Sequence, residues 1–381
     1  MSYAAALSEH PLASHATGEV VGEVREALGT RPDLAVVFVS GAHGDHIDEI
    51  VTTVNEVLAP LRLVGGTAVS VLGGGREVEE RPAVSLWAAR LGAVPPAVHL
   101  ETLSTPEGVA VAGLPLEATS KGGTLLLIAD PFSFPGEAFV SSLGQDDTAD
   151  LRIVGGLASG AASPGGNRLI LDDAVHSSGA VGALLPPGLR IDTVVSQGCR
   201  PVGAPFIVTA AERNVIHELA GRPALERLRT LIDEADDDER DLMGRGLHVG
   251  LVIDESKIDF QRGDFLVRGV VGADEASGSV TVGALVEVGS TVQFHVRDAA
   301  TADEDLRELM NDRPRAEAAL VFTCNGRGSH LFGVQDHDAA VVSEALRGGP
   351  VAGMFCAGEF GPVGGANFVH GFTASVVLFG R

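Results

Sequence analysis

Two charged side chains in the last quarter of the sequence follow apolar segments and form the leading candidate for a binding pair. Arg327 follows the apolar segment 318–323, within a polar, glycine-rich loop of sequence CNGRG. Glu359 follows the apolar segment 350–357 and lies between glycines. A guanidinium presents paired donors to a carboxylate, whereas a carboxylate accepts hydrogen bonds from an ammonium group. The two side chains therefore suit a small ligand of the amino-acid kind, and the alternative is a structural ion pair between them.

The loop around Arg327 and one pair of glycines supply further candidate ligand contacts. Glycine lets the backbone approach a ligand closely, because it carries no Cβ atom. The alternative for the glycines is tight packing inside a sheet. The candidates from these two places are Cys324, Asn325, Gly326, Gly65 and Gly66.

A cysteine-dependent hydrolase or transferase is the second functional hypothesis. It would use Cys324 or Cys356 together with His330 or His370. Both cysteines end or lie in apolar segments of strand length, where a buried and unreactive thiol is the usual state. We therefore assign no catalytic residue. A protein-interaction scaffold without any ligand is the third hypothesis.

Metal and cofactor motifs are weak or missing in the sequence. His43, Asp45 and His46 share one loop, but no third ligand follows at a typical metal-binding spacing. Neither the pattern GxxxxGK[ST] nor a GxGxxG pattern after a strand occurs. We therefore expect neither a metal nor a cofactor.

The elements that must position these residues recur along the sequence. Each copy starts with an apolar segment of strand length, continues into a helical segment and returns in a second strand. The strand pairs are 34–40 with 61–66, 124–129 with 151–156, and 319–323 with 351–353. The first two copies are offset by 90 residues (151 − 61), and their second strands read LRLVGG and LRIVGG.

Further strands follow the first two copies at 82–91 and 180–185. These segments predict an α/β protein of mixed, layered sheets with helices on the outer faces, built from duplicated β-α-β-β units. An α-β-β-α sandwich is the arrangement considered for the layers. Before the third copy, an antiparallel sheet is expected from strands at 247–253, 265–271, 279–282 and 291–297.

The bulk composition limits the partners and the compartment. The chain has 381 residues, 45% of them hydrophobic, and a formal net charge of −24. Nucleic acids and anionic membranes require a basic surface, so we expect neither as a partner. The three cysteines form no CxxC motif, and the sequence has neither a secretory signal pattern nor an apolar run of membrane-spanning length. We expect a cytoplasmic protein without membrane insertion.

Several short motifs follow one another along most of the chain. They are GGREVE at 74–79, SQGCRPVG at 196–203, GDFLVR at 263–268, CNGRG at 324–328, GEFGP at 358–362 and NFVHGFT at 367–373. With these motifs the chain resembles a stand-alone protein of the FIST family, in which a FIST N domain precedes a FIST C domain. We accordingly expect a lead-in at 1–30, a FIST N-like domain at 31–188 and a FIST C-like domain at 189–381.

The resemblance implies a sensory protein of signal transduction. Such a protein binds a small polar ligand, for example an amino acid, and passes the signal to a protein partner. Three residues within the matching motifs complete the predicted ligand contacts: Arg76, Asn367 and His370. The resemblance implies no catalytic residue.

Overall fold

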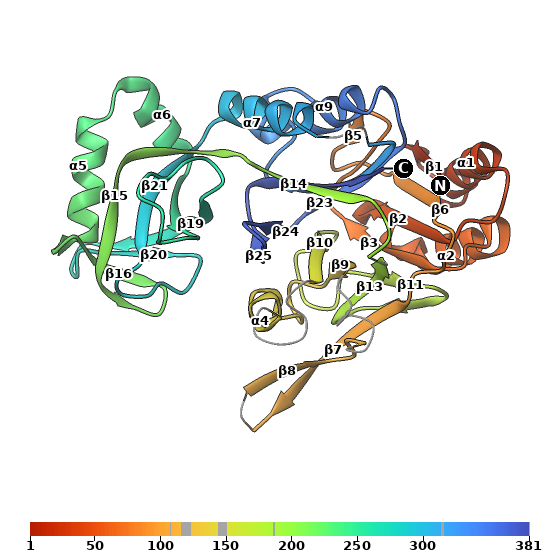
Figure 1. Ribbon diagram of the computed structural model, residues 1–381, viewed down its shortest axis with the longest axis horizontal. Helices are drawn as coiled ribbons and strands as arrows, with labels where there is room; N and C mark the ends of the chain where they lie inside the picture. Colours follow the sequence, from red (N-terminus) through yellow and green to blue (C-terminus); the bar gives the residue numbers. More distant parts are fainter. Residues whose placement is uncertain (107, 116–122, 144–150, 186, 314–315, 381) are drawn as a thin grey trace. The chain divides into compact units, whose positions relative to one another are not determined.

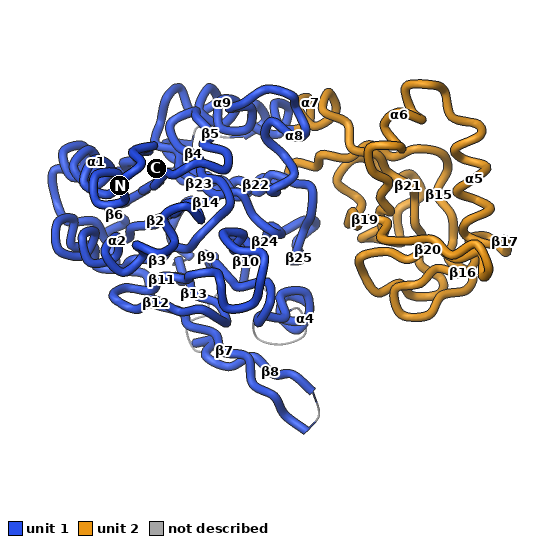
Figure 2. The backbone as a smooth tube through the Cα atoms, turned by 180° about the vertical axis from the view of Figure 1, so that it is seen from behind, with its two compact units in different colours: residues 1–195, 306–381 blue, residues 196–305 orange. Residues whose placement is uncertain are grey.

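The computed structural model describes residues 1–106, 108–115, 123–143, 151–185, 187–313 and 316–380. They form unit 1, residues 1–195 and 306–381, and unit 2, residues 196–305 (Figure 2). Both units combine mixed or antiparallel sheets with helices, which confirms the α/β class (Figure 1). The division into 31–188 and 189–381 stays a prediction, and unit 1 takes segments from both sides of residue 188.

Unit 1 contains three β-α-β segments, each with a parallel strand pair. The pairs are β2 (Leu34–Ser40) with β3 (Leu63–Ala68), β9 (Gly123–Ala129) with β10 (Leu151–Leu157), and β22 (Ala318–Cys324) with β23 (Val351–Cys356). The connections are η1 (Gly41–His46), α2 (Ile47–Thr53) and η2 (Val54–Leu58); α4 (Gly136–Ser142); and α8 (Ser329–Phe332) with α9 (His337–Ala345). Antiparallel to the first strand of each pair lie β6 (Val84–Arg90), β13 (Ala180–Leu185) and β26 (Thr373–Phe379). The predicted strand pairs and the strands predicted at 82–91 and 180–185 are confirmed, whereas β26 was not predicted.

A hairpin from another segment completes the open side of each parallel pair. The hairpins are β4 (Val71–Gly73) with β5 (Arg76–Val78), β11 (Leu169–Leu171) with β12 (Ala174–His176), and β24 (Glu359–Val363) with β25 (Ala366–His370). Strand β4 pairs with β23, β11 with β3, and β24 with β10, each time antiparallel. The first segment thus donates its hairpin to the third, the third to the second, and the second to the first.

The remaining strands of unit 1 extend these sheets at their other ends. The lead-in 1–30 takes part in the first sheet, because β1 (Ser2–Ser8) pairs with β6 and α1 (Ala13–Leu28) packs on the same core. Strands β7 (Ala97–Thr105) and β8 (Gly108–Ala112) extend the second sheet beyond β13. Strand β14 (Ile191–Gln197) lies next to β26 in the third sheet.

The three sheets face one another across a shared apolar core. Phe38 of the first segment, Ile128 of the second and Phe322 of the third are buried in this one cluster. The rings of Phe38 and Phe322 lie 5.8 Å apart, edge to face. Apolar residues of α1 and α2, of α4, and of α7 (Ala299–Asn311) and α9 cover the outer faces. The sandwich considered above has two facing sheets, whereas unit 1 has three, because each of the three parallel strand pairs lies at the centre of a separate sheet.

A glycine occupies the same place in the second strand of each pair. The glycines and the residues opposite them are Gly65 with Val37, Gly155 with Leu127, and Gly353 with Val321. A Cβ atom there would lie only 2.2, 1.9 and 2.1 Å, respectively, from the carbonyl oxygen opposite. At Gly66 a Cβ atom would meet Ile128 at 2.9 Å. Protein atoms therefore fill the space beside Gly65 and Gly66, which supports the packing alternative for this pair.

Unit 2 is built on one antiparallel sheet. Its strands, in order, are β15 (Cys199–Glu212), β21 (Thr291–Arg297), β18 (Leu247–Val252), β19 (Phe265–Asp274), β20 (Ser279–Val282), β16 (Val215–Leu219) and β17 (Arg222–Pro223). A further pairing between β15 and β16 closes the sheet on itself. Helices α5 (Ala224–Glu234) and α6 (Asp237–Arg245) pack on its apolar core. The four antiparallel strands predicted between 247 and 297 are confirmed.

We expect Gly155→Ala to destabilise the protein strongly. Gly155 has φ +132°, and an added Cβ atom would lie 1.9 Å from the Leu127 carbonyl oxygen. Backbone strain and overpacking each cost about 1–3 kcal/mol, so the free energy of unfolding should fall by about 3 kcal/mol or more. Gly22→Ala in α1, where the Cβ position is open, is the control and should stabilise by about 0.5–1 kcal/mol. Urea unfolding followed by circular dichroism measures both, and equal stabilities would contradict the close packing.

Candidate functional site

Arg327 lies in the loop after β22 and is fully buried. Its Nε donates to Asp338 Oδ2 at 2.7 Å, and its Nη2 donates to Asp338 Oδ1 at 2.8 Å. Neither side chain has exposed surface. The guanidinium carbon of Arg327 also lies 5.2 Å from the centre of the Phe332 ring in α8. One edge of the guanidinium is thus fixed by a bidentate ion pair, and one face is covered by an aromatic ring.

Asp338, in the first turn of α9, has two further hydrogen-bonding neighbours. Thr323 Oγ1 donates to Asp338 Oδ2 at 2.6 Å, and His337 Nδ1 lies 2.9 Å from Asp338 Oδ1. Burial acts to raise the pKa of Asp338, but the Arg327 guanidinium outweighs burial and holds this pKa well below its usual range. The pair therefore consists of a fully charged carboxylate and a fully charged guanidinium.

The ionic partner of Arg327 is not the one considered from the sequence. That pair was Arg327 with Glu359, whereas the ion pair joins Arg327 to Asp338. Glu359, at the start of β24, is also fully buried, and its Oε2 accepts from Thr373 N at 3.2 Å and Thr373 Oγ1 at 2.7 Å. Burial acts to lower the pKa of Arg327, while the charges of Asp338, Cys324 and Glu359 raise it. Glu359 therefore acts on Arg327 through its charge.

Two glutamates of the first segment hold the Arg327 loop and α9, and the sequence analysis did not select them. Glu79 accepts from Ser329 N at 2.9 Å and from Ser329 Oγ at 2.5 Å. Glu77, in β5, accepts from Ala339 N at 3.0 Å, and its own N–H donates to Asp336 Oδ1 at 2.6 Å. The signal that could have identified them is the alternation Glu-Val-Glu next to buried strands, which places both acids on one side of the chain.

We name this group the Arg327 cluster and define it as Arg327, Asp338, Thr323, Ser329, Glu77 and Glu79. Within it, Arg327 Nη1 and Glu77 Oε2 are buried and have no hydrogen-bond partner among the residues that the structure describes. A buried polar group without a partner costs about 1–3 kcal/mol. Such groups are rare in folded proteins and indicate a place for a ligand, an ion or a water molecule.

The carboxyl group of Glu77 has an unusual protonation equilibrium. Burial, together with the negative charges of Asp338, Glu79 and Asp336, raises its pKa to about 8, against the hydrogen bond from Ala339 N, which acts to lower it. Only 2% of the Glu77 surface is exposed. Glu77 is therefore largely a neutral carboxylic acid near pH 7, beside the charged Arg327–Asp338 pair.

The two cysteines of the enzyme hypothesis lie side by side but are poorly suited to nucleophilic attack. Cys324 and Cys356 are partners in the parallel register of β22 and β23, and both are buried. Burial, together with the charge of Glu359, raises the pKa of the Cys356 thiol well above its usual value. His330 has 65% of its side chain exposed and lies 3.7 Å from Glu80. His370 Nε2 lies 2.9 Å from the Gly361 carbonyl oxygen.

Of the other predicted ligand contacts, Asn325 and Gly326 lie in the Arg327 loop, whereas Arg76 and Asn367 lie outside it. Asn325 N donates to the Cys356 carbonyl at 2.8 Å, so Asn325 and the adjacent Gly326 belong to that loop. Arg76 is 62% exposed and forms an ion pair with Glu9. Asn367 accepts from Ile153 N at 2.8 Å and donates to the Leu151 carbonyl at 2.7 Å, and thereby joins β25 to β10. Their ligand roles stay predictions.

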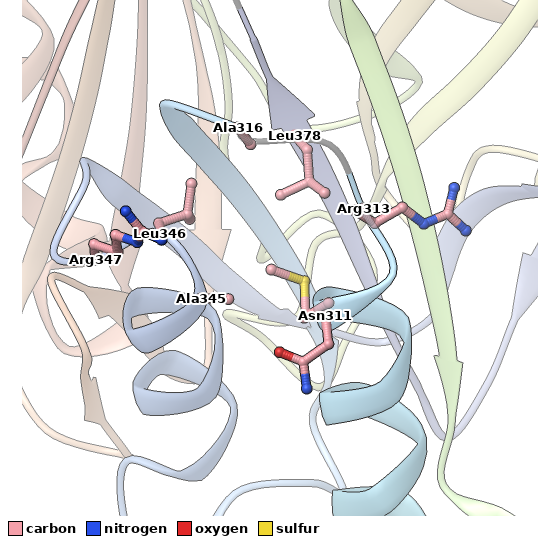
Figure 3. Close-up of a pocket in the computed structure, with 8 residues that line it drawn as sticks. Asn311, Arg313, Ala316, Ala345, Leu346, Arg347 and Leu378 are labelled. Carbon is pink, nitrogen blue, oxygen red and sulfur yellow. The ribbon is translucent and has the colours of Figure 1, made fainter.

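A separate pocket of about 250 Å³ lies between the C-terminal ends of α7 and α9 (Figure 3). It is lined by Met310, Asn311, Arg313, Ala316, Ala345, Leu346, Arg347 and Leu378. Figure 3 shows Arg313 extending away from Asn311, and Arg313 Nη1 binds the Asp192 carboxylate at 3.1 and 3.2 Å. None of the predicted ligand contacts lines this pocket.

The described residues also lack two features that would indicate other functions. No three of their His, Cys, Asp or Glu side chains are arranged to hold a metal ion. None of their helices combines the length and the apolar composition that crossing a membrane requires.

Two known domain families match the chain over most of its length. Residues 33–222 match the FIST N domain, and residues 224–362 match the FIST C domain. The uncharacterized protein Rv0628c of Mycobacterium tuberculosis is 44% identical over 382 residues, which cover 98% of this chain and 98% of that protein. The uncharacterized protein Mb0898c of Mycobacterium bovis is 43% identical over 375 residues, which cover 97% of this chain and 96% of that protein.

We expect Glu77→Gln to change how stability depends on pH. The folded-state pKa of about 8 lies above the ordinary value of 4.5 for a glutamate, so unfolding releases a proton at pH values between the two. The stabilisation is therefore complete below about pH 4.5 and is lost as pH rises through 8. As pH rises across this range, the free energy of unfolding of Glu77→Gln should therefore increase relative to that of the parent by up to about 1.4 kcal/mol for each pH unit. Urea unfolding at pH 5, 6, 7 and 8 measures the free energy of unfolding, and Glu26→Gln, at an exposed position of α1, is the control. If the free energy of Glu77→Gln changed with pH in the same way as that of the parent, Glu77 would not have a raised pKa.

We expect the buried ion pair to show strong coupling in a double-mutant cycle. Arg327→Met and Asp338→Asn each leave one buried charge unpaired, which should cost about 3–5 kcal/mol, and the double variant should cost less than the two losses added. The exposed pair Arg240–Asp237, with a 2.9 Å contact, is the control, where the same substitutions should cost at most about 1 kcal/mol. Urea unfolding gives all free energies. A loss at Arg327→Met no larger than at Arg240→Met would contradict a buried pair.

Proposed function

The chain belongs to the FIST family, whose domains are sensory domains of signal transduction, and from this premise we propose that it senses a small polar metabolite at the Arg327 cluster. The proposed ligand is an amino acid or a related small carboxylate. A signalling protein would read the ligand-bound state. We propose the cytoplasm as the compartment, in line with a sequence whose three cysteines lie far apart and form no CxxC motif.

The observation that carries the proposal is the second edge of the Arg327 guanidinium. Asp338 fixes Nε and Nη2, while Nη1 is buried without a partner among the described residues. A guanidinium that is already oriented loses little conformational entropy when it binds a carboxylate. Its surroundings exclude water, which strengthens a charge-assisted hydrogen bond. These properties favour a small anion over a neutral ligand.

The burial of Arg327 suggests how binding becomes a signal. Because the side chain has no exposed surface, a ligand reaches it only when the covering segment moves. Phe332 in the four-residue helix α8 covers the guanidinium, and Ser329 ties the same helix to Glu79. Displacement of α8 would present a changed surface to a partner. A ligand would thus be coupled to a shape change through its preference for the open form.

The two alternatives receive less support. A cysteine-dependent enzyme needs a thiolate, and both burial and the charge of Glu359 keep the Cys356 thiol protonated. A scaffold without a ligand gives no account of the unpartnered Arg327 Nη1. The scaffold is nevertheless the outcome that the following experiment would favour if no compound binds.

We expect a small carboxylate to raise the melting temperature of the protein. Amino acids, organic acids and nucleotides are screened by thermal shift, and a ligand at one hundred times its Kd should add about 2.7 kcal/mol of stability. Arg327→Lys keeps a positive charge beside Asp338 but loses Nη1, so the shift should fall or vanish in that variant. Arg200→Lys, at a half-buried ion pair with Glu239 and Asp298 in unit 2, is the matched control and should keep the shift. An unchanged shift in a folded Arg327→Lys would place the ligand elsewhere.

A further inference from the structure

The hairpin β7–β8 has exposed residues on both of its faces. Residues 103–105 of β7 and residues 108–110 of β8 are exposed, and Leu103 and Val109 have 46% and 64% of their surface exposed. Figures 1 and 2 both show the hairpin extending away from the rest of unit 1. A two-stranded ribbon with little buried surface is only marginally stable in water. The hairpin is therefore as exposed as a segment that becomes buried when a partner binds.

Strand β8 is the terminal strand of its sheet and carries none of the usual protections against pairing. In the sheet order it follows β7, and no strand lies beyond it among the described residues. Its sequence Gly-Val-Ala-Val-Ala contains no charge and no proline. Natural edge strands are commonly blocked by a charged side chain, a proline or a bulge. An open edge without these features is suited to strand addition.

The charge of the chain indicates which partner fits this edge. With a net charge of −24, two copies repel one another wherever their acidic surfaces meet. The segment 108–112 is uncharged, so two copies can approach there without bringing like charges together. An antiparallel strand pair is also self-complementary about a twofold axis, which is the commonest symmetry of protein dimers.

We propose that two copies of this chain form a dimer by antiparallel pairing of β8 with β8 of the partner subunit. The twofold axis would pass beside Ala110, the middle residue of the strand, so that Ala110 lies opposite Ala110 of the partner subunit. Val109 then lies opposite Val111 of the partner subunit, and all residues of 108–112 are paired. The two sheets that end at β8 become one continuous sheet across the dimer.

An apolar groove supports the same position for the added strand. It has a volume of about 530 Å³ and is lined by residues 109–114, by Ala138, Phe139 and Ser142 of α4, and by Pro135 and Leu143 at the two ends of that helix. Successive residues of β8 point to opposite faces, so a groove lined by residues 109–112 of the strand follows its edge. A strand added there covers the groove and buries its apolar lining.

We expect the full-length protein to be a dimer, and a charge at position 110 to break it. Ala110 is exposed, so Ala110→Glu and Ala110→Lys should fold, but each places like charges opposite one another at the twofold axis. Light scattering coupled to size-exclusion chromatography should give a dimer for the parent and a monomer for each variant. An equal mixture of the two variants should recover the dimer, because Glu and Lys then face each other. Val334→Glu, at an exposed valine far from β8 in sequence, is the control and should remain dimeric.

Three results would overturn the proposal. The parent could be monomeric at every concentration tested, which excludes the dimer. The variants could stay dimeric with unchanged melting temperature, which places the interface on another surface. The mixture could stay monomeric although both variants are folded, which excludes the twofold axis at Ala110. Circular dichroism of each variant confirms folding.

Discussion

Each of the three parallel strand pairs leaves one edge without hydrogen bonds, and the organisation of unit 1 follows from how these edges are closed. A hairpin from a different segment pairs with each edge, so β4 completes the third sheet, β24 the second and β11 the first. No segment can satisfy its own backbone groups alone. The exchange also brings Glu77 and Glu79 of the first segment to the loop and helix of the third. The Arg327 cluster is therefore a product of the strand exchange.

The three segments place different side chains at corresponding positions of the same loop. In each parallel pair, the residue opposite the shared glycine is Val37, Leu127 or Val321, and the residue six places further along the chain is His43, Ser133 or Arg327, respectively (37 + 6, 127 + 6 and 321 + 6). His43 Nε2 lies 3.2 Å from a backbone carbonyl, and burial lowers its pKa. Ser133 Oγ donates to Asp130. Only the third of these positions holds a buried guanidinium, so the shared architecture provides the frame and one segment provides the charge chemistry.

Much of the frame was predictable, because a strand buried on both faces is a continuous apolar segment that can be recognised locally. The same local reasoning selected Arg327 and the glycines as candidates. Local reasoning did not identify which residues contact one another. Glu77 and Ala339 are 262 residues apart, and nothing near Glu77 in the sequence indicates α9. This reasoning also paired Arg327 with Glu359, whereas the ionic partner is Asp338, which lies in the helix that follows the loop. Gly65 and Gly66 were ambiguous for a related reason: the carbonyl oxygen and the side chain that exclude a Cβ atom there come from other strands.

The late position of the hairpin β24–β25 in the sequence affects how the chain folds during its synthesis on the ribosome. Strand β10 ends at Leu157, but the strand that closes its edge begins only at Glu359, 202 residues later (359 − 157). While the intervening chain is being synthesised, β10 has no native partner on that side, and open edges in incomplete sheets favour aggregation. A nascent chain of this kind depends on protection by chaperones for longer than one whose sheets close locally. Its final assembly must wait for distant contacts, which are slow to form.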